Sequence, residues 1–383
     1  MRRTQWAAKG QKVRSLLASG PDFFYRQARR AWGLNSEPAL YYVVPDANWV
    51  TDWVGRYVVT AVTHQFNVKA QLTTAPHLLV DHIIHYGEAG AFLASLESRR
   101  NRQNTLIATI FHGNLAPQFP QLTRNTEKFL INTSQLTRVV TACRIMENRL
   151  LDWGVPAEKV VCLPLGVDLA KFRPATAAQR QIYRSQIDVP QNAFCVGSFQ
   201  KDGAGWGEGL TPKLVKGPDV FLAVMARVFQ QQKNLFVLLT GPARGYVKQG
   251  LDKLGIPYRH QILENYHDVV TMYHCLDAYL VASREEGGPN AVLESLACGV
   301  PLVSTRVGTA PDVITHDGNG LLADVDDVAG LAESIGRLAD DQNLGGRLAL
   351  QGLADIQKYD WSLIGVRYYR ELYAPIFAAL KDG

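Results

Sequence analysis

The segment that decides the fold runs Val281-Ala-Ser-Arg-Glu-Glu-Gly-Gly-Pro-Asn-Ala-Val-Leu-Glu-Ser-Leu-Ala-Cys-Gly-Val-Pro301. Residues 277–282 form an apolar stretch typical of a buried strand, and the two glycines after it let a ligand approach the backbone closely. A helix is predicted over residues 291–297, with Asn290 as its N-cap. Its free N–H groups and its dipole attract phosphate at its start. The segment therefore predicts a strand, a ligand-binding turn and a helix, which is the repeating unit of an α/β protein.

Two glutamates stand on either side of this turn. Glu286 lies on the incoming side and Glu294 lies about one turn into the helix, so both carboxylates can face a ligand held at the helix start. An ionised carboxylate accepts hydrogen bonds and donates none, so it is well suited to bind the hydroxyls of a sugar. The alternative is that both are solvated acids at a helix end, stabilised by the helix dipole alone.

Apolar strands alternate with helical stretches along the whole chain, which predicts parallel sheets built from βαβ units. The turn-rich residues 166–174 separate two such series. We therefore expect an α/β fold of two doubly wound, Rossmann-like domains that face one another across a cleft. The expected strands cover residues 39–44, 79–85, 105–111, 138–142 and 160–164, then 194–199, 235–240, 260–264, 277–282, 301–305 and 320–323.

The segment resembles the family 4 (group 1) retaining glycosyltransferases, which have the two-domain GT-B fold. Their signature is a glutamate, seven residues, a second glutamate and a small-residue helix that ends Ala-Cys-Gly-x-Pro, here residues 286–301. The turn Leu165-Gly-Val-Asp168 is similar to the family's domain junction. The resemblance implies an acceptor-side domain of residues 36–170 plus 364–383 and a nucleotide-sugar-binding domain of residues 171–363. Charge and helical spacing predict a basic amphipathic segment at 1–35, before these domains.

The resemblance also assigns catalytic roles to Glu286, His112 and Lys216. Lys216 precedes Gly217 at the place where the family keeps a lysine for the donor diphosphate, and a cation there would neutralise the leaving group. His112, in Ile110-Phe-His-Gly113, would point across the cleft at the transferred sugar. The plainer alternatives are a solvated loop lysine and a structural histidine.

Donor binding is expected to involve further residues of the second domain. The family usually has an arginine where this chain has Ser198, so Lys201 or Arg244 must substitute for it. A glycine-rich insert, residues 202–209, fails the dinucleotide-binding pattern. It is interpreted as a mobile loop near the cleft mouth, with Trp206 available to stack on a ligand; the alternative is a plain flexible loop. The predicted donor-binding residues are Glu294, Gly287, Gly288, Asn290, Ala291, Lys201 and Arg244.

The acceptor side departs from the family. The glycine pair expected after the first strand is missing, and Pro45-Asp-Ala-Asn-Trp-Val-Thr-Asp-Trp53 replaces it. Asp46, Asn48 and Trp49 are candidates for sugar contacts through hydrogen bonds and stacking. Alternatively, this stretch closes the bottom of the cleft.

The 383 residues, 47% hydrophobic and 20% charged, suffice for two cores. No apolar run approaches the roughly 18 residues of a membrane span, and no secretory leader is evident. The five cysteines are expected to be reduced core residues, so a cytoplasmic location is predicted. Residues 1–35 hold eight basic residues against one acidic residue. They are predicted either to contact an anionic membrane at the inner face or to pack on the first domain.

The leading hypothesis is a retaining glycosyltransferase that moves a sugar from a nucleoside diphosphate to a hydroxyl of a glycan, a lipid-linked sugar or a small molecule. No cofactor, no bound metal and no nucleic-acid partner are expected. The acidic pair Asp324-Val-Asp326 is explained better by helix capping than by metal binding. Two alternatives are a GT-B nucleotide-sugar epimerase, which would convert its donor without an acceptor, and a degenerate, non-catalytic scaffold.

Overall fold

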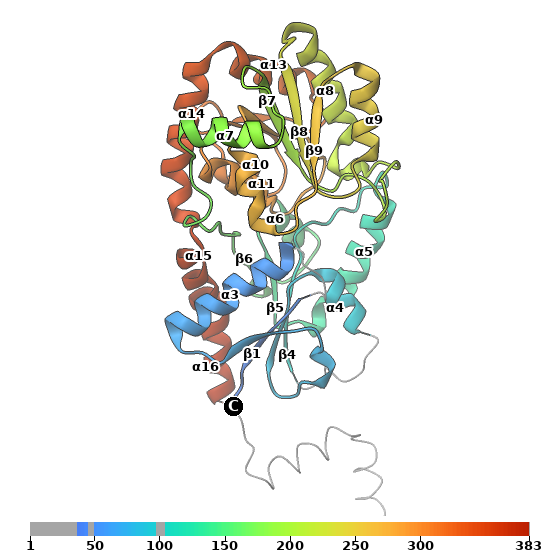
Figure 1. Cartoon of the computed structure of the whole chain (residues 1–383). Helices are drawn as coiled ribbons and strands as arrows, with labels where there is room; N and C mark the ends of the chain where they lie inside the picture. Colours follow the sequence, from blue (N-terminus) through green and yellow to red (C-terminus); the bar gives the residue numbers. More distant parts are fainter. Residues whose placement is uncertain (1–36, 45–49, 97–103, 383) are drawn as a thin grey trace, which may run out of the picture.

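The protein folds into two α/β domains, each built on a six-stranded parallel sheet (Figure 1). The computed structural model describes residues 37–44, 50–96 and 104–382. The predicted fold class is therefore confirmed. The basic segment 1–35 and the acceptor candidates Asp46, Asn48 and Trp49 lie outside the described residues.

The first sheet has the strand order β2-β1-β3-β4-β5-β6. The chain reverses its direction of winding between β1 and β3, so this pair marks the position where a doubly wound sheet opens a crevice at its carboxyl edge. Its strands are β1 Leu40–Val43, β2 Ala70–Thr73, β3 Ile83–Tyr86, β4 Thr105–Thr109, β5 Arg138–Thr141 and β6 Val160–Cys162.

The second sheet has the order β12-β11-β10-β7-β8-β9. This is the strand order of a Rossmann domain, with its reversal between β7 and β10. A ligand is therefore expected beyond the carboxyl ends of these two strands. The strands are β7 Phe194–Phe199, β8 Leu235–Thr240, β9 Tyr258–Gln261, β10 Ala278–Val281, β11 Leu302–Thr305 and β12 Leu321–Ala323.

Helices connect the strands and cover both sheets. Those of the first half are α3 Val50–Phe66, α4 Ala89–Ser95, α5 Pro120–Ile131 and α6 Arg144–Asp152. Those of the second half are α7 Ala177–Gln186, α8 Pro218–Gln231, α9 Gly245–Leu254, α10 Val269–Tyr273, α11 Asn290–Ala297, α12 Ala310–Val313, α13 Val328–Asp340 and α14 Gln342–Asp355. The chain ends in α15 Trp361–Arg367, a π-helical turn Tyr368–Tyr373 and α16 Ala374–Asp382.

Alternating side chains of each strand reach opposite faces of the sheet, so each sheet has an apolar core on both sides. In β8, Val237 and Leu239 pack under α8, α9 and α13, whereas Phe236 and Leu238 pack on the opposite face. That second core continues through Leu165 and neighbouring residues of the junction into the first domain. The two domains thus share one continuous apolar layer.

The strand predictions agree well with the structure, except at one edge. Each of the eleven predicted stretches contains or overlaps a strand, and the bounds differ by a few residues. The strand β2 was not predicted, because its sequence Ala-Gln-Leu-Thr has no apolar run. An edge strand exposes one side to solvent and so lacks the continuous apolar pattern of the inner parallel strands.

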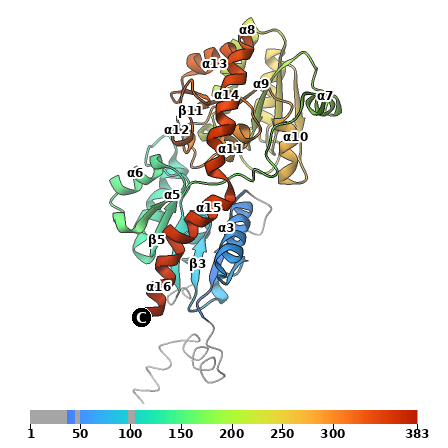
Figure 2. The same ribbon diagram turned by 90° about the vertical axis from the view of Figure 1, so that its left-hand side faces the viewer.

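The chain crosses between the domains twice, and the two crossings lie side by side. Val167 pairs with Asp360 as a parallel bridge, and the Val167 N–H donates to the Tyr359 carbonyl at 2.9 Å. Gly166 is required there, because a Cβ at this position would lie 2.6 Å from the Trp361 ring. After this second crossing α15 packs against α3, and the chain descends along the first domain (Figure 2).

His85 fastens this returning segment to the first sheet. Its Nδ1 lies 2.6 Å from the Tyr373 hydroxyl and its Nε2 lies 2.8 Å from Thr109 Oγ1, with no exposed surface. Burial lowers the pKa of His85 to about 3, so the imidazole is neutral in the folded protein. The unfolded chain has an ordinary histidine pKa near 6.5 and binds a proton first as the pH falls.

We expect His85→Gln to make the protein less sensitive to acid. The stability that depends on neutral His85 is complete above about pH 6.5 and is lost progressively toward pH 3, by about 1.4 kcal/mol per pH unit. Urea unfolding at pH 7.5 and pH 4.5 measures this loss. The variant should start less stable and lose about 2–3 kcal/mol less than the wild type over this interval. His64→Gln, on the exposed side of α3, should keep the wild-type loss; an unchanged loss in His85→Gln would contradict the expectation.

Candidate functional site

Lys216 and Glu286 form the centre of the site at the carboxyl edge of the second sheet. The Lys216 ammonium lies 2.7 Å from both carboxylate oxygens of Glu286, and Ser283 Oγ donates to the same carboxylate at 2.9 Å. The Glu286 side chain is 10% exposed and that of Lys216 is 28% exposed. The pair is thus held in place yet remains open to a ligand.

Glycine fixes the position of Lys216. Lys216 ends a 3-10 turn, and the next residue, Gly217, has a φ of 61°. A Cβ on Gly217 would lie 1.9 Å from the carbonyl oxygen of Ala282, at the end of β10. The chain can therefore bring Lys216 against the strand that precedes Glu286 only because residue 217 has no side chain.

Two further lysines surround this pair. Lys213 lies close enough for the charges of Lys201 and Lys216 to affect it, and its pKa is lowered, first by burial and then by these two lysines. Lys201 places its ammonium 3.6 Å from the centre of the Trp206 ring. Lys213 was missed by the sequence analysis, although it stands only three residues before Lys216. Three ammonium groups near the carboxyl end of β7 are suited by their charge to a multiply charged anion.

His112 faces this group from the first domain. It follows β4 and its side chain keeps access to solvent, while neighbouring residues still desolvate the imidazole. This desolvation lowers the pKa of His112, the charge of Lys216 acts in the same direction, and Glu286 opposes it. His112 is therefore neutral near pH 7 and lies within electrostatic reach of both members of the central pair. The structure thus brings together Glu286, Lys216 and His112.

The neighbouring Glu285 holds the two domains together at the same place. Its carboxylate receives Arg149 Nη1 at 2.5 Å and Asn114 Nδ2 at 3.0 Å, and only 4% of its side chain is exposed. Both partners belong to the first domain. The sequence did not predict that Glu285 contacts the first domain, because nothing in two adjacent glutamates indicates which one faces an interface.

The glycines of the turn are pressed against the first domain. A Cβ on Gly287 would lie 2.0 Å from the carbonyl oxygen of Phe111, and one on Gly288 would lie 2.9 Å from Leu165 Cδ1. Only glycine permits the first of these approaches, because the obstructing atom belongs to the backbone. The turn thus connects the central pair directly to the segment that carries His112.

Glu294 is engaged by two tyrosines. It is 5% exposed, and its carboxylate accepts hydrogen bonds from the hydroxyls of Tyr266 and Tyr273, the latter at 2.8 Å. Burial raises the pKa of Glu294. The Tyr266 ring stacks on Trp53 of α3, with 5.8 Å between the ring centres. The Tyr266 hydroxyl occupies Glu294 Oε1, so a ligand hydroxyl that binds this oxygen would compete with it.

Two predicted roles need correction. Arg244 is not available to a ligand: it is 1% exposed, pairs with the buried Asp202 at 3.0 Å and donates to the Ser198 carbonyl at 2.6 Å. It anchors the base of the glycine-rich loop instead. Asn290 does not cap α11, because the N-cap is Pro289 and no side chain caps the helix; Asn290 Nδ2 lies 3.4 Å from the Tyr266 hydroxyl. Ala291 is partly buried and packs on the core.

The acidic pair at 324–326 does not cap a helix either. Asp327 caps α13 through the Gly330 N–H, and Asp326 pairs with Arg284. In the part of the chain that the structure describes, no group of three or more His, Cys, Asp or Glu side chains could hold a metal ion. Across the same residues, no helix is both long enough and apolar enough to cross a membrane.

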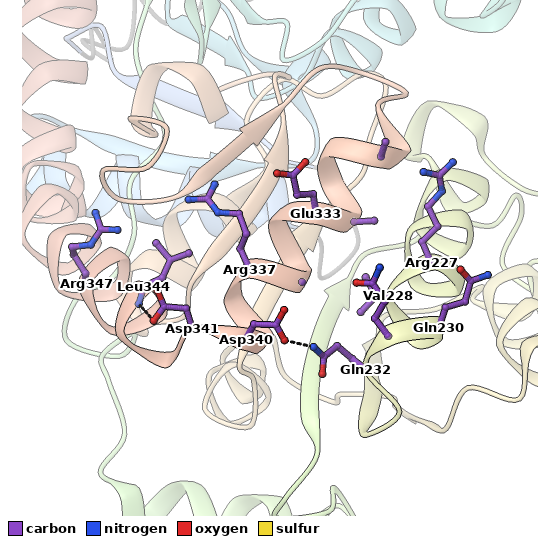
Figure 3. A pocket seen from close by; sticks show the side chains of 14 residues that line it. Arg227, Val228, Gln230, Gln232, Glu333, Arg337, Asp340, Asp341, Leu344 and Arg347 are labelled. Carbon is purple, nitrogen blue, oxygen red and sulfur yellow. Dashed lines mark hydrogen bonds between the residues drawn. The ribbon is translucent and has the colours of Figure 1, made fainter.

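A large open groove lies far from this site, between α8 and α13 at the end of the second domain remote from the first (Figures 1 and 3). It has a volume of about 870 Å³ and mixed charges. Arg227 stands on one side of it and Glu333, Arg337 and Asp340 on the other (Figure 3). Because it lies away from the carboxyl edge of the sheet, it is not part of the candidate site.

Residues 211–352 match the family model described as glycosyl transferases group 1. These residues therefore form a group 1 glycosyl transferase domain. The match covers Lys213, Lys216, Glu286 and Glu294, so the main features of the site lie inside the family domain. The predicted family is confirmed.

Curated relatives match longer or overlapping parts of the chain. A D-inositol 3-phosphate glycosyltransferase of Corynebacterium efficiens is 24% identical over 69% of this chain and 60% of its own length. An N-acetyl-alpha-D-glucosaminyl L-malate synthase of Bacillus anthracis is 28% identical over 45% of each chain. The matched regions thus span about half of these relatives.

Solved structures confirm the GT-B fold of the chain. A sucrose-phosphate synthase from Thermosynechococcus elongatus superimposes with a TM-score of 0.72 over 90% of this chain and all of its own, at 17% identity. The Anabaena protein HepE, solved with UDP and glucose, gives a TM-score of 0.69 over 88% of this chain and 99% of its own, at 18% identity.

Proposed function

We propose that this protein is a retaining glycosyltransferase that moves a sugar from a nucleoside diphosphate sugar to an acceptor hydroxyl. The observation that carries the proposal is the Lys216–Glu286 pair, set where the second sheet reverses its winding and facing His112. A cation for the diphosphate and a carboxylate for the sugar hydroxyls then lie side by side.

The lysines supply the charge that the departing diphosphate needs. Lys216, with Lys213 and Lys201 beside it, would stabilise the negative charge that develops on the leaving group. The start of α11 would add its N–H groups and dipole to the same anion. These groups provide neutralisation from the protein itself, which supports transfer without a metal ion.

We propose that the anomeric configuration is retained because the acceptor hydroxyl attacks the sugar on the same face from which the diphosphate departs. Both carboxylates of the central loop have other roles, because in this proposal Glu286 binds the sugar hydroxyls and Arg149 holds Glu285. A covalent intermediate would need a carboxylate free to attack the sugar. The neutral imidazole of His112 would then orient the sugar or the incoming hydroxyl by hydrogen bonding.

The activity can be tested with a panel of nucleoside diphosphate sugars and hydroxylated acceptors. We expect release of the nucleoside diphosphate to depend on both substrates, and the anomeric configuration of the product, read by NMR, to match that of the donor. Conversion of the donor with no acceptor present would instead identify an epimerase. Donor binding without turnover across the panel would identify a non-catalytic scaffold.

Tyr266→Phe is expected to tighten nucleotide binding. If Glu294 holds the ribose through Oε1, the ribose must displace the Tyr266 hydroxyl, and the variant removes this competitor. A hydrogen bond to a charged group contributes about 1.5–3 kcal/mol, so the Kd of the nucleoside diphosphate should fall by about tenfold. Isothermal titration measures the change.

Tyr273→Phe is the matched control for this experiment. Its hydroxyl also donates to Glu294, but the side chain is fully buried. It should therefore lower stability without tightening the binding of the nucleotide. Weaker nucleotide binding by Tyr266→Phe would show that the Tyr266 hydroxyl assists the ligand rather than competing with it.

A further inference from the structure

A small pocket opens in the first domain beside His112. It lies at the carboxyl ends of β3 and β4, next to the position where the first sheet reverses its winding, and its volume is about 200 Å³. Ligands of doubly wound sheets bind in crevices at such positions. His112 itself lines the pocket, and Phe111, which also lines it, lies against Gly287 of the donor-side loop. A molecule held there would stand next to the proposed donor site.

The size and lining of the pocket suit a single hydroxylated ring. Its volume is below the range of about 300–1,000 Å³ that holds drug-sized ligands. Leu93, Ile110 and Leu122 provide apolar walls, while Asn125 and Thr126 add polar groups. A cyclic polyol presents an apolar ring face and several hydroxyls. It therefore fits a pocket that has apolar walls and a few hydrogen-bonding groups.

Charge narrows the choice of ligand. Glu88 is the one acidic side chain among the lining residues, and no lysine or arginine lines the pocket. Burial raises the pKa of Glu88, and no nearby cation is among the causes of that shift. Lys216 and Lys213 lie near enough to lower the pKa of His112, but neither lysine lines the pocket. An anionic group in the pocket would therefore meet a partly desolvated carboxylate, with no lysine or arginine among the lining residues to neutralise it.

We propose that this pocket is the acceptor subsite and that Glu88 selects a hydroxylated ring that is uncharged or carries an amine, and rejects one that carries a phosphate. Its role in accepting the sugar rests on the proposed transferase function. Glu88 accepts O–H or N–H donors of the ring, and His112 faces the hydroxyl nearest the donor. The selection is electrostatic, because like charges at close range are strongly disfavoured.

The test measures binding to the full chain by methyl NMR, without any nucleotide sugar. The probes are myo-inositol, glucosamine and D-inositol 3-phosphate. We expect the first two to shift the methyl signals of Ile110 and Leu122, and the phosphate to bind at least about tenfold more weakly. Glu88→Lys should reverse this order, and Glu88→Gln should remove the penalty for the phosphate.

Matched variants of the exposed Glu127 on α5, Glu127→Gln and Glu127→Lys, should keep the wild-type order. The proposal is overturned if D-inositol 3-phosphate binds as well as myo-inositol, if no probe shifts these signals, or if Glu88→Lys leaves the order unchanged. Sugar transfer is measured separately with nucleoside diphosphate sugars. A protein that orders the probes as expected but transfers no sugar would contradict the transferase function alone.

Discussion

Replacing Lys216 by methionine should lower kcat/KM for sugar transfer by about 10²–10³-fold, the usual effect of removing one group that stabilises developing negative charge. Methionine keeps much of the length of the side chain but has no charge for the diphosphate. The variant also leaves Glu286 without its cation, so the sugar-binding carboxylate loses its fixed position. Initial rates at varied donor concentration, with the acceptor saturating, measure the effect.

The same substitution at Lys253 is the matched control. Lys253 is exposed on α9, away from the cleft. Lys253→Met should retain wild-type kcat/KM, and both variants should unfold within a few degrees of the wild type, because neither lysine is buried in a core. Turnover by Lys216→Met within threefold of the wild type would exclude Lys216 from stabilising the leaving group.

Gly287→Ala should lower kcat by about 10²-fold. The turn can then no longer pack against Phe111 of the first domain, so the reacting groups are displaced by about 1 Å or more. The new Cβ would lie 2.0 Å from the Phe111 carbonyl oxygen, and a backbone atom cannot rotate away. The domains can relieve the overlap by separating. The midpoint of thermal unfolding should therefore change little while catalysis is lost.

Gly288→Ala separates this effect from a general effect of an alanine in the turn. Its Cβ would approach Leu165 Cδ1 at 2.9 Å, and a leucine side chain can adjust. Activity within about fivefold of the wild type is expected, since volume changes that repacking can absorb cost little. Equal losses in the two variants would contradict an interdomain origin, and small-angle scattering would report whether Gly287→Ala is more extended.

The fold was largely predictable because the inner strands of a parallel sheet are apolar on both faces. The stretches at 194–199 and 235–240 match β7 and β8 residue for residue. The edge strand β2 lacks this signal, because solvent covers part of it. The apolar stretches thus predicted the strands that are buried on both faces, and they missed a strand that is only partly buried.

The candidate site was predictable where chemistry follows a local pattern. Glu286 and Lys216 are 70 residues apart, and resemblance to a known family placed both at the ligand-binding edge. The partners of Glu285 could not be predicted, because Arg149 and Asn114 reach it from another domain. Arg244 was assigned to the ligand for its charge, and only the packing shows that Asp202 and Ser198 engage it inside the protein.

The returning C-terminal segment has a consequence for the order of synthesis. Tyr373 bonds to His85 in the core of the first domain, and α15 packs on α3. The first domain therefore cannot complete its packing until the whole second domain has been made and residue 373 has left the ribosome. Domains made first usually fold first. Here the domain that is translated first completes its packing last. The surface that the C-terminal segment will cover stays exposed while the second domain is made, and it needs protection during that time.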